Sequence, residues 1–233
     1  MTYIFNHKDI PVLAHTDILV IGAGSAGCLA ALSAARQDRY SVMLIERYGF
    51  PGGASTQMLD TFYGFFTPGI SPLKIVGGLP DKVVNELDKT NDIFLRPNTY
   101  GAGTGVTYNP ERLKMVWDRL IVEAGINYLL HTTLVDVVKE ENELITCVFW
   151  NKSGFYRVKA RRVIDASGDA DFCALAGYSF ELAGDNEPVQ SMTTTFRMCN
   201  VDQYKFEKAG GNKMMKERMA DAFENRFFTE MRT

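Results

Sequence analysis

Apolar runs and a helix-forming segment alternate over the first fifty residues of the chain. Asp17–Ile21 and Ser41–Glu46 are mostly aliphatic, and short apolar runs bounded by turn residues are typical of strands buried in a parallel sheet. Between them, Cys28–Arg36 is rich in Ala and Leu, which are strong helix formers. The pattern therefore predicts a strand–helix–strand unit of an α/β fold.

A second helix–strand pair follows in the middle of the chain. Asn109 and Pro110 form a typical helix start, with Asn as N-cap and Pro at the first helical position. The predicted helix Glu111–Glu123 carries apolar residues at helical spacing, so one face is buried, and Ile126–Leu130 is predicted to be the third parallel strand. Between Gln57 and Tyr108 the chain is assigned to an insertion, whose one expected regular element is a helix at about Pro80–Leu87.

Apolar and polar residues alternate in three segments after residue 132. Thr133–Lys139, Leu144–Trp150 and Gly154–Ala160 predict a β-meander. Further on, Gln190–Met198 is interpreted as a strand and Asn212–Met231 as a helix. That helix carries a stripe with i, i+4 spacing, which is more typical of core packing or a subunit contact than of a cofactor site. The stripe consists of Met215, Met219, Phe223 and Phe227.

Composition narrows the class of protein. The 233 residues carry a net charge of −3, so there is no basic excess to neutralise a phosphate backbone, and nucleic acid is not expected as a partner. The apolar runs are too short to span a membrane, and the N-terminus shows no secretory signal. We expect a cytoplasmic protein without membrane association.

The cysteines and histidines do not suggest a metal site. Cys28, Cys147, Cys173 and Cys199 are far apart in the sequence, without a C-x-x-C spacing, and the three histidines are scattered. A zinc site or an iron–sulfur cluster held by this chain alone is therefore not expected. We expect all four cysteines to be small buried residues. His131 is a weak candidate for a proton donor, and no catalytic residue is identified.

The glycines after the first predicted strand have the spacing G-x-G-x-x-G. Gly22 permits the tight turn from strand to helix, Gly24 lets the backbone approach a pyrophosphate, and Gly27 allows close packing of helix on strands. Ser25 and Ala26 complete the motif, and the N-terminus of the following helix offers amide N–H groups to phosphates. Because the motif follows a strand and opens a helix, it predicts a dinucleotide site.

Glu46 ends the second predicted strand. A carboxylate at this point accepts hydrogen bonds from the hydroxyls of an adenosine ribose, and it repels a 2′-phosphate. The site is therefore expected to prefer a ligand without that phosphate.

The residues after Glu46 carry a resemblance to a known family. Arg47, the pair Gly52 and Gly53, and Ser55 behind them resemble the FAD-dependent oxidoreductases of the glutathione-reductase type, and more closely the heterodisulfide-reductase A-like proteins. The resemblance implies that the glycine pair runs beside the pyrophosphate and toward the flavin of FAD.

Later residues extend the resemblance. Ala166, Ser167 and Gly168 are similar to the family's A-T-G-type turn, which returns the chain to the first glycine loop. The resemblance also implies a backbone contact to adenine near Val135. Two segments are candidates to face a substrate, although ordinary packing or a solvent loop is the plainer interpretation of each: Phe62–Phe66 and Tyr100–Gly105.

The fold class implied is a Rossmann-like FAD-binding domain, with a parallel sheet and β-meander, an inserted helical segment and the beginning of a substrate domain. Four segments follow from this division: residues 1–56 and 109–177 for the FAD-binding domain, 57–108 for the insertion, and 178–233 for a partial substrate domain. Relatives carry a further C-terminal glycine–acid motif that this sequence lacks. We therefore expect a fragment, or a second polypeptide that completes the flavin site.

Three functions remain open from the sequence. The first is an FAD-dependent oxidoreductase that passes a hydride or electrons through flavin N5 to an unknown small-molecule substrate, as an oligomer or with an electron-transfer partner. The second is a non-redox enzyme of the thiazole-synthase type that uses NAD. The third is a catalytically silent nucleotide-binding subunit.

Overall fold

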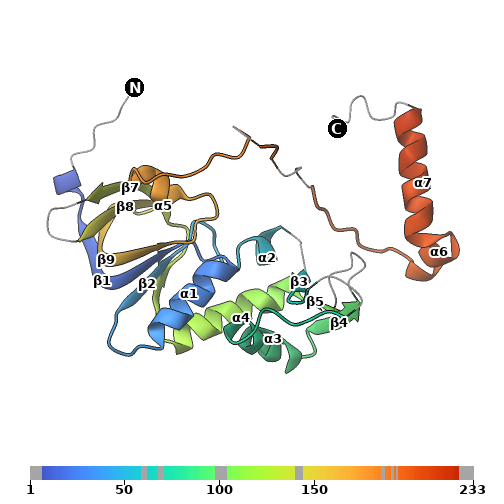
Figure 1. Cartoon of the computed structure of the whole chain (residues 1–233), viewed down its shortest axis with the longest axis horizontal. Helices are drawn as coiled ribbons and strands as arrows, with labels where there is room; N and C mark the ends of the chain where they lie inside the picture. The colour runs from blue at the N-terminus through green and yellow to red at the C-terminus, as the bar shows by residue number, and fades with distance from the viewer. Residues whose placement is uncertain are drawn as a thin grey trace. The chain divides into compact units, whose positions relative to one another are not determined.

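The computed structural model describes residues 7–58, 62–67, 71–97, 104–139, 144–184, 187–189, 192 and 194–225. The chain divides into two compact units, Met1–Thr195 and Phe196–Thr233, and each unit is considered by itself below. Figure 1 shows that the first unit holds the sheet and most of the helices.

A six-stranded mixed sheet is the centre of the first unit. Its spatial order is β6-β2-β1-β9-β8-β7. The neighbours from β6 to β9 are parallel, whereas β9, β8 and β7 form an antiparallel meander. The strands are β1 (Val12–Ile21), β2 (Val42–Ile45), β6 (Asn127–Leu129), β7 (Thr133–Lys139), β8 (Ile145–Asn151) and β9 (Gly154–Asp165).

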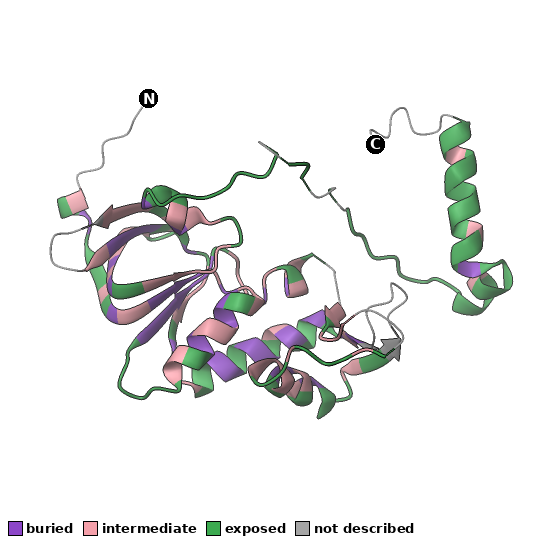
Figure 2. Cartoon of the chain, viewed as in Figure 1, coloured by how far each residue is buried: buried purple, intermediate pink, exposed green. Residues whose placement is uncertain are grey.

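Alternating residues of the central strands supply two hydrophobic cores. Val20 of β1 and Leu44 of β2 belong to the cluster that contains Leu32 of α1 (Ser25–Ala35) and Trp117 of α4 (Pro110–Glu123). The residues next to Val20 and Leu44 along these strands belong to a second cluster, which also contains residues of the meander and of α5 (Asp171–Leu175). Because successive side chains of a strand point to opposite faces, one apolar run fills both cores. Figure 2 shows the buried residues concentrated in these strands and along α1 and α4.

The strand–helix–strand unit, the helix α4, the third parallel strand and the meander are confirmed, with two extensions. β1 begins at Val12, five residues before the predicted start, because it pairs along its length with β9. β9 runs without interruption from Gly154 to Asp165, five residues beyond the predicted end at Ala160. It leads directly into the turn formed by Ala166, Ser167 and Gly168, named the A-S-G turn below.

The insertion contains more structure than was predicted. The helix α3 (Leu79–Asp88) is confirmed. A three-stranded antiparallel sheet, in the order β3-β5-β4, was missed; its strands are β3 (Phe62–Gly64), β4 (Ile93–Pro97) and β5 (Thr104–Tyr108). The candidate segment Phe62–Phe66 thus begins as a strand, and residues 100–103 of the second candidate lie outside the described part of the chain.

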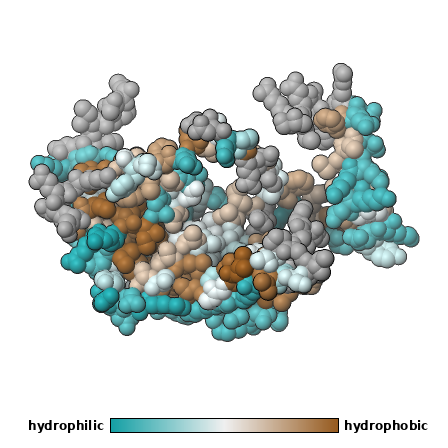
Figure 3. All heavy atoms as spheres, viewed as in Figure 1, coloured by the Kyte–Doolittle hydropathy of each residue, from teal (hydrophilic) through white to brown (hydrophobic). Residues whose placement is uncertain are grey.

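The second unit consists of α6 (Gln203–Lys208) and α7 (Gly211–Glu224). Met215, Met219 and Phe223 are exposed, so they are not core residues of this unit. The alternative that the stripe makes a subunit contact stays a prediction, and Phe227 lies outside the described residues. Figure 3 shows the largely hydrophilic surface of these helices. The strand predicted at Gln190–Met198 is also wrong, because its described residues, 192 and 194–198, adopt no regular structure.

Two of the four cysteines are buried as expected, namely Cys28 and Cys147, whereas Cys173 is half-buried and Cys199 is exposed. The expectation was therefore wrong for Cys173 and for Cys199, which precedes α6 in the second unit. Among the helices described, none has both the length and the apolar character needed to cross a membrane.

Candidate cofactor-binding site

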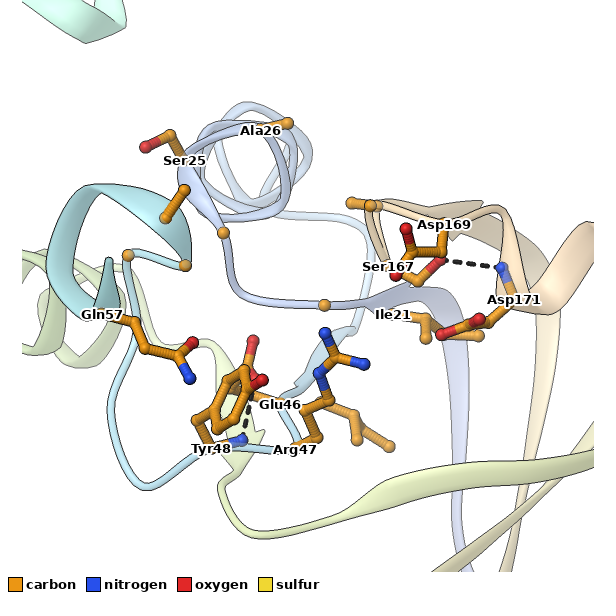
Figure 4. Close-up of a pocket in the computed structure, with 18 of the residues that line it drawn as sticks. Ile21, Ser25, Ala26, Glu46, Arg47, Tyr48, Gln57, Ser167, Asp169 and Asp171 are labelled. Carbon is orange, nitrogen blue, oxygen red and sulfur yellow. Dashed lines mark hydrogen bonds between the residues drawn. The ribbon is translucent and has the colours of Figure 1, made fainter. Parts of the chain in front are cut away.

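A cavity of about 670 Å³ opens at the carboxyl ends of β1, β2 and β9, which is where ligands bind in open α/β sheets. Its volume lies in the range of cofactor and small-molecule pockets. Figure 4 shows part of the lining, with the N-terminal end of α1 on one side and the segment after Glu46 on another. The lining consists of Ile21, Gly22, Gly24, Ser25, Ala26, Ile45, Glu46, Arg47, Tyr48, Gly52, Gly53, Ala54, Ser55, Gln57, Met58, Thr132, Thr133, Leu134, Ala166, Ser167, Gly168, Asp169 and Asp171.

Two glycines of the motif are required by packing. Gly22 has a φ of +93°, and a Cβ built on it would lie 2.3 Å from the carbonyl oxygen of Ala166. A Cβ on Gly27 would lie 1.8 Å from the carbonyl oxygen of Gly22. Both positions therefore exclude a side chain, and they bring the beginning of α1 against the A-S-G turn.

Gly24 and Gly53 make the part of the wall where a dinucleotide backbone would lie. A Cβ on Gly24 would have one heavy atom within 4 Å, the Cα of Gly53 at 3.9 Å. Gly24 is also the N-cap of α1, where the described structure has no side-chain hydrogen bond to the first amides. The helix therefore presents uncapped N–H groups beside a surface that has no side chain, which fits a pyrophosphate.

Glu46 is buried and joins two backbone segments. Its Oε2 accepts a hydrogen bond of 2.7 Å from the Ala23 N–H, and its Oε1 accepts one of 2.8 Å from the Tyr48 N–H. A carboxylate has about four acceptor positions, so acceptor capacity remains for ribose hydroxyls. Glu46 thus shapes the glycine loop, a role that was not predicted for it.

The wall beyond Glu46 comes from two segments. The Arg47 guanidinium lies 5.0 Å from the centre of the Tyr48 ring, and the other side is formed by Thr132, Thr133 and Leu134. Val135 is not among the described residues that line the cavity, whereas Leu134 directly before it is. The backbone contact to adenine near Val135 therefore stays a prediction.

Asp165 organises the A-S-G turn. Its Oδ1 accepts hydrogen bonds from Ser167 N–H at 3.0 Å and from Ser167 Oγ at 2.6 Å, and its Oδ2 accepts one from Cys173 N–H at 3.0 Å. Burial alone would raise the pKa of Asp165, but these hydrogen bonds outweigh it and hold the pKa below its usual range. The Ser167 hydroxyl also accepts from the Asp171 N–H at 2.9 Å, so it primarily fixes the turn.

Of the fourteen residues predicted for the site, twelve line the cavity. The exceptions are Gly27, which has the packing role expected of it, and Val135. The lining residues that were not predicted are Ile21, Ile45, Tyr48, Ala54, Gln57, Met58, Asp169, Asp171 and the Thr132–Leu134 segment. The position of Asp169 and Asp171 directly after the A-S-G turn was a usable signal. The others come to the cavity only through folding.

Two side chains with the reactivity needed for catalysis, Cys28 and His131, do not line the cavity. Burial raises the pKa of the Cys28 thiol to about 12, and the thiol donates to the Ala23 carbonyl oxygen at 3.2 Å. His131 is exposed, has a φ of +52° and donates its backbone N–H to the Tyr48 carbonyl oxygen, and it is not among the described residues that line the cavity. Neither position supports a catalytic role.

Comparison with known families finds a match over nearly the whole chain. The family described as "FAD dependent oxidoreductase" matches residues 17–232. A search of curated proteins finds no match.

Solved structures share the fold at low identity. The p-nitrophenol 4-monooxygenase PnpA from Pseudomonas putida DLL-E4 is similar with a TM-score of 0.51 and 13% identity, over 72% of this chain and 45% of that one. BexE, studied for oxidation during BE-7585A biosynthesis, has a TM-score of 0.50 and 14% identity, over 70% and 34%. THI4 from Thermovibrio ammonificans has a TM-score of 0.48 and 18% identity, over 71% and 64%. The chain spans less than two thirds of the length of each.

Proposed function

The chain belongs to the family of FAD dependent oxidoreductases, and we propose that its cavity holds the adenosine diphosphate part of FAD and orients the flavin for oxidation or reduction of a small molecule. When bound, FAD supplies hydride or electron transfer through its N5 atom. The residues of this chain bind and orient the cofactor.

One observation carries the proposal: the side-chain-free wall formed by Gly24 and Gly53 at the uncapped N-terminus of α1. A diphosphate there receives hydrogen bonds from the first amides of the helix and the positive end of the helix dipole. Glu46, at the end of β2, is in position to accept from ribose hydroxyls, and its charge disfavours a 2′-phosphate. The glycine pair then leads the rest of the cofactor toward α2 (Ala54–Gln57).

The flavin environment is the second part of the proposal. Relatives of known structure are longer than this chain, and we propose that a further polypeptide segment or a second chain contributes to the flavin environment. We also propose that the protein self-associates or works with an electron-transfer partner.

The test is purification of the 233-residue protein followed by its visible spectrum, release of the bound ligand and determination of the ligand mass. We expect FAD, or, if the protein is isolated empty, saturable binding of FAD and ADP by calorimetry. Bound NAD or an adenylated thiazole in a colourless protein would favour the thiazole-synthase-type alternative. Binding of FAD without reduction by any tested donor would favour a silent subunit, and absence of adenine nucleotide binding would refute all three.

A further inference from the structure

The insertion reaches the cavity wall through two tyrosines. Tyr63 of β3 and Tyr108 of β5 pack with ring centroids 4.5 Å apart. The Tyr63 hydroxyl lies 3.3 Å from Ser25 Oγ, and the Tyr108 hydroxyl donates a hydrogen bond of 3.1 Å to the Ser55 carbonyl oxygen. The small antiparallel sheet is therefore bonded to both glycine-containing segments of the site.

Ser25 and Ser55 also contact each other, with 2.9 Å between their Oγ atoms. Ser25 is the first residue of α1 and Ser55 lies in α2, and both line the cavity. A row of three hydroxyls thus runs from Tyr63 through Ser25 to Ser55.

The direction of donation along this row depends on what lies in the cavity. A hydroxyl has one proton to donate and can accept two. When Tyr63 donates to Ser25, the Ser25 proton is available to an acceptor in the cavity. An anion at the N-terminus of α1 favours this direction, because hydrogen bonds to charged acceptors are the stronger ones and successive bonds polarise one another.

The Tyr63 ring is held in place before any ligand binds. It packs on Tyr108, which is buried, and stacks on Phe65 with 5.5 Å between ring centroids. A donor whose position is already restricted loses little entropy when it is used.

We propose that Tyr63 is a positioning residue for the diphosphate of the bound dinucleotide, acting through Ser25, and that the insertion is thereby part of the cofactor site. The inference rests on the proposed function of this cavity. For Tyr63 it adds a role in the cofactor site to the two interpretations of Phe62–Phe66 given from the sequence, which were a substrate-facing segment and ordinary packing.

A double-mutant cycle tests the proposal. Dissociation constants for FAD, ADP and adenosine are measured with the full chain and with Tyr63→Phe, Ser25→Ala and the double variant. We expect Tyr63→Phe to weaken FAD and ADP binding about fivefold, to leave adenosine binding unchanged, and to have no further effect in the Ser25→Ala background. Tyr63→Phe keeps the ring packing, and the unfolding midpoint of the empty protein checks its fold.

Tyr156→Phe is the matched control, because the Tyr156 hydroxyl donates to the Ser153 carbonyl oxygen in the β8–β9 hairpin and it should not change any dissociation constant. Equal losses from Tyr63→Phe in the wild-type and Ser25→Ala backgrounds, or equal losses for adenosine and ADP, would overturn the role of Tyr63 while leaving the proposed function intact. Failure of the wild-type chain to bind FAD and ADP would overturn the proposed function itself, and this inference with it.

Discussion

The backbone N–H of Ala23 donates a hydrogen bond of 2.7 Å to Oε2 of Glu46. This contact joins the middle of the glycine motif to the end of β2. Since Glu46 Oε1 accepts from the Tyr48 N–H as well, a single buried carboxylate determines the shape of two segments of the cavity wall. The residue expected to recognise the ribose therefore also stabilises the empty site.

Glu46→Gln tests this double role. The amide has one oxygen in place of two, so one of the two backbone N–H groups loses its acceptor, at a cost of about 1–3 kcal/mol. We expect a lower free energy of unfolding in urea without ligand and a weaker affinity for FAD by calorimetry. Glu123→Gln, on the exposed end of α4, is the control and should change neither; an unchanged stability of Glu46→Gln would contradict the role in the loop.

Gly24→Val tests the placement of the diphosphate. Gly24 has a φ of −65°, and its built Cβ has a nearest heavy atom at 3.9 Å, so a Cβ is accommodated. Because Gly24 lines the cavity, the methyl groups of valine would take up space that we propose for the diphosphate. We expect FAD and ADP binding to be lost, whereas the unfolding free energy falls by no more than about 1 kcal/mol, the size of an N-cap effect. Retention of FAD by the valine variant would refute the placement.

Gly22→Ala is expected to act differently, through the fold. The new methyl group would lie 2.3 Å from the Ala166 carbonyl oxygen at a φ of +93°, which combines a steric clash with backbone strain. We expect a clear fall in the midpoint of thermal unfolding of the empty protein. A variant as stable as the wild type would show that the A-S-G turn and the glycine loop are not packed as described.

Asp165→Asn tests the hydrogen bonds of the A-S-G turn through pH. The folded pKa of Asp165 is lowered, so the charged carboxylate adds stability above the unfolded pKa of about 3.9, and this contribution disappears as the pH falls through the folded value. We expect the variant to be less stable at pH 7. We also expect it to lose less stability than the wild type as the pH falls from about 5 through the folded pKa, because over this range the wild-type carboxylate takes up its proton. Urea unfolding over this range measures both effects, and parallel pH curves would count against the assignment.

Alkylation by iodoacetamide at pH 8 distinguishes the cysteines. Burial raises the pKa of both Cys28 and Cys147 to about 12, and the thiolate is the reactive form. We expect Cys199, which is exposed, to react in the native protein, and Cys28 and Cys147 to react only after unfolding in urea, as shown by peptide masses. Rapid native labelling of Cys28 would contradict its burial and would support a nucleophilic role for this thiol.

The sequence by itself determined the strand–helix–strand unit, the helix α4, the meander and most of the glycine-rich wall. These features follow from local rules: the period of the apolar residues, the capping of Asn109, and backbone positions such as Gly22 that tolerate no side chain. Each of these signals lies within one or two neighbouring elements, so it can be recognised from the sequence alone.

Only the tertiary structure decided which distant residues meet. The short strands β3, β4 and β5 have too few residues for a clear period, and they are stabilised by pairing with one another. The approach of Tyr63 to Ser25 and the hydrogen bond between Glu46 and Ala23 both depend on packing between segments far apart in the chain. The same is true of the approach of the Thr132–Leu134 segment to the cavity. Contacts of this kind are set by the free energy of the whole fold and leave no local pattern in the sequence.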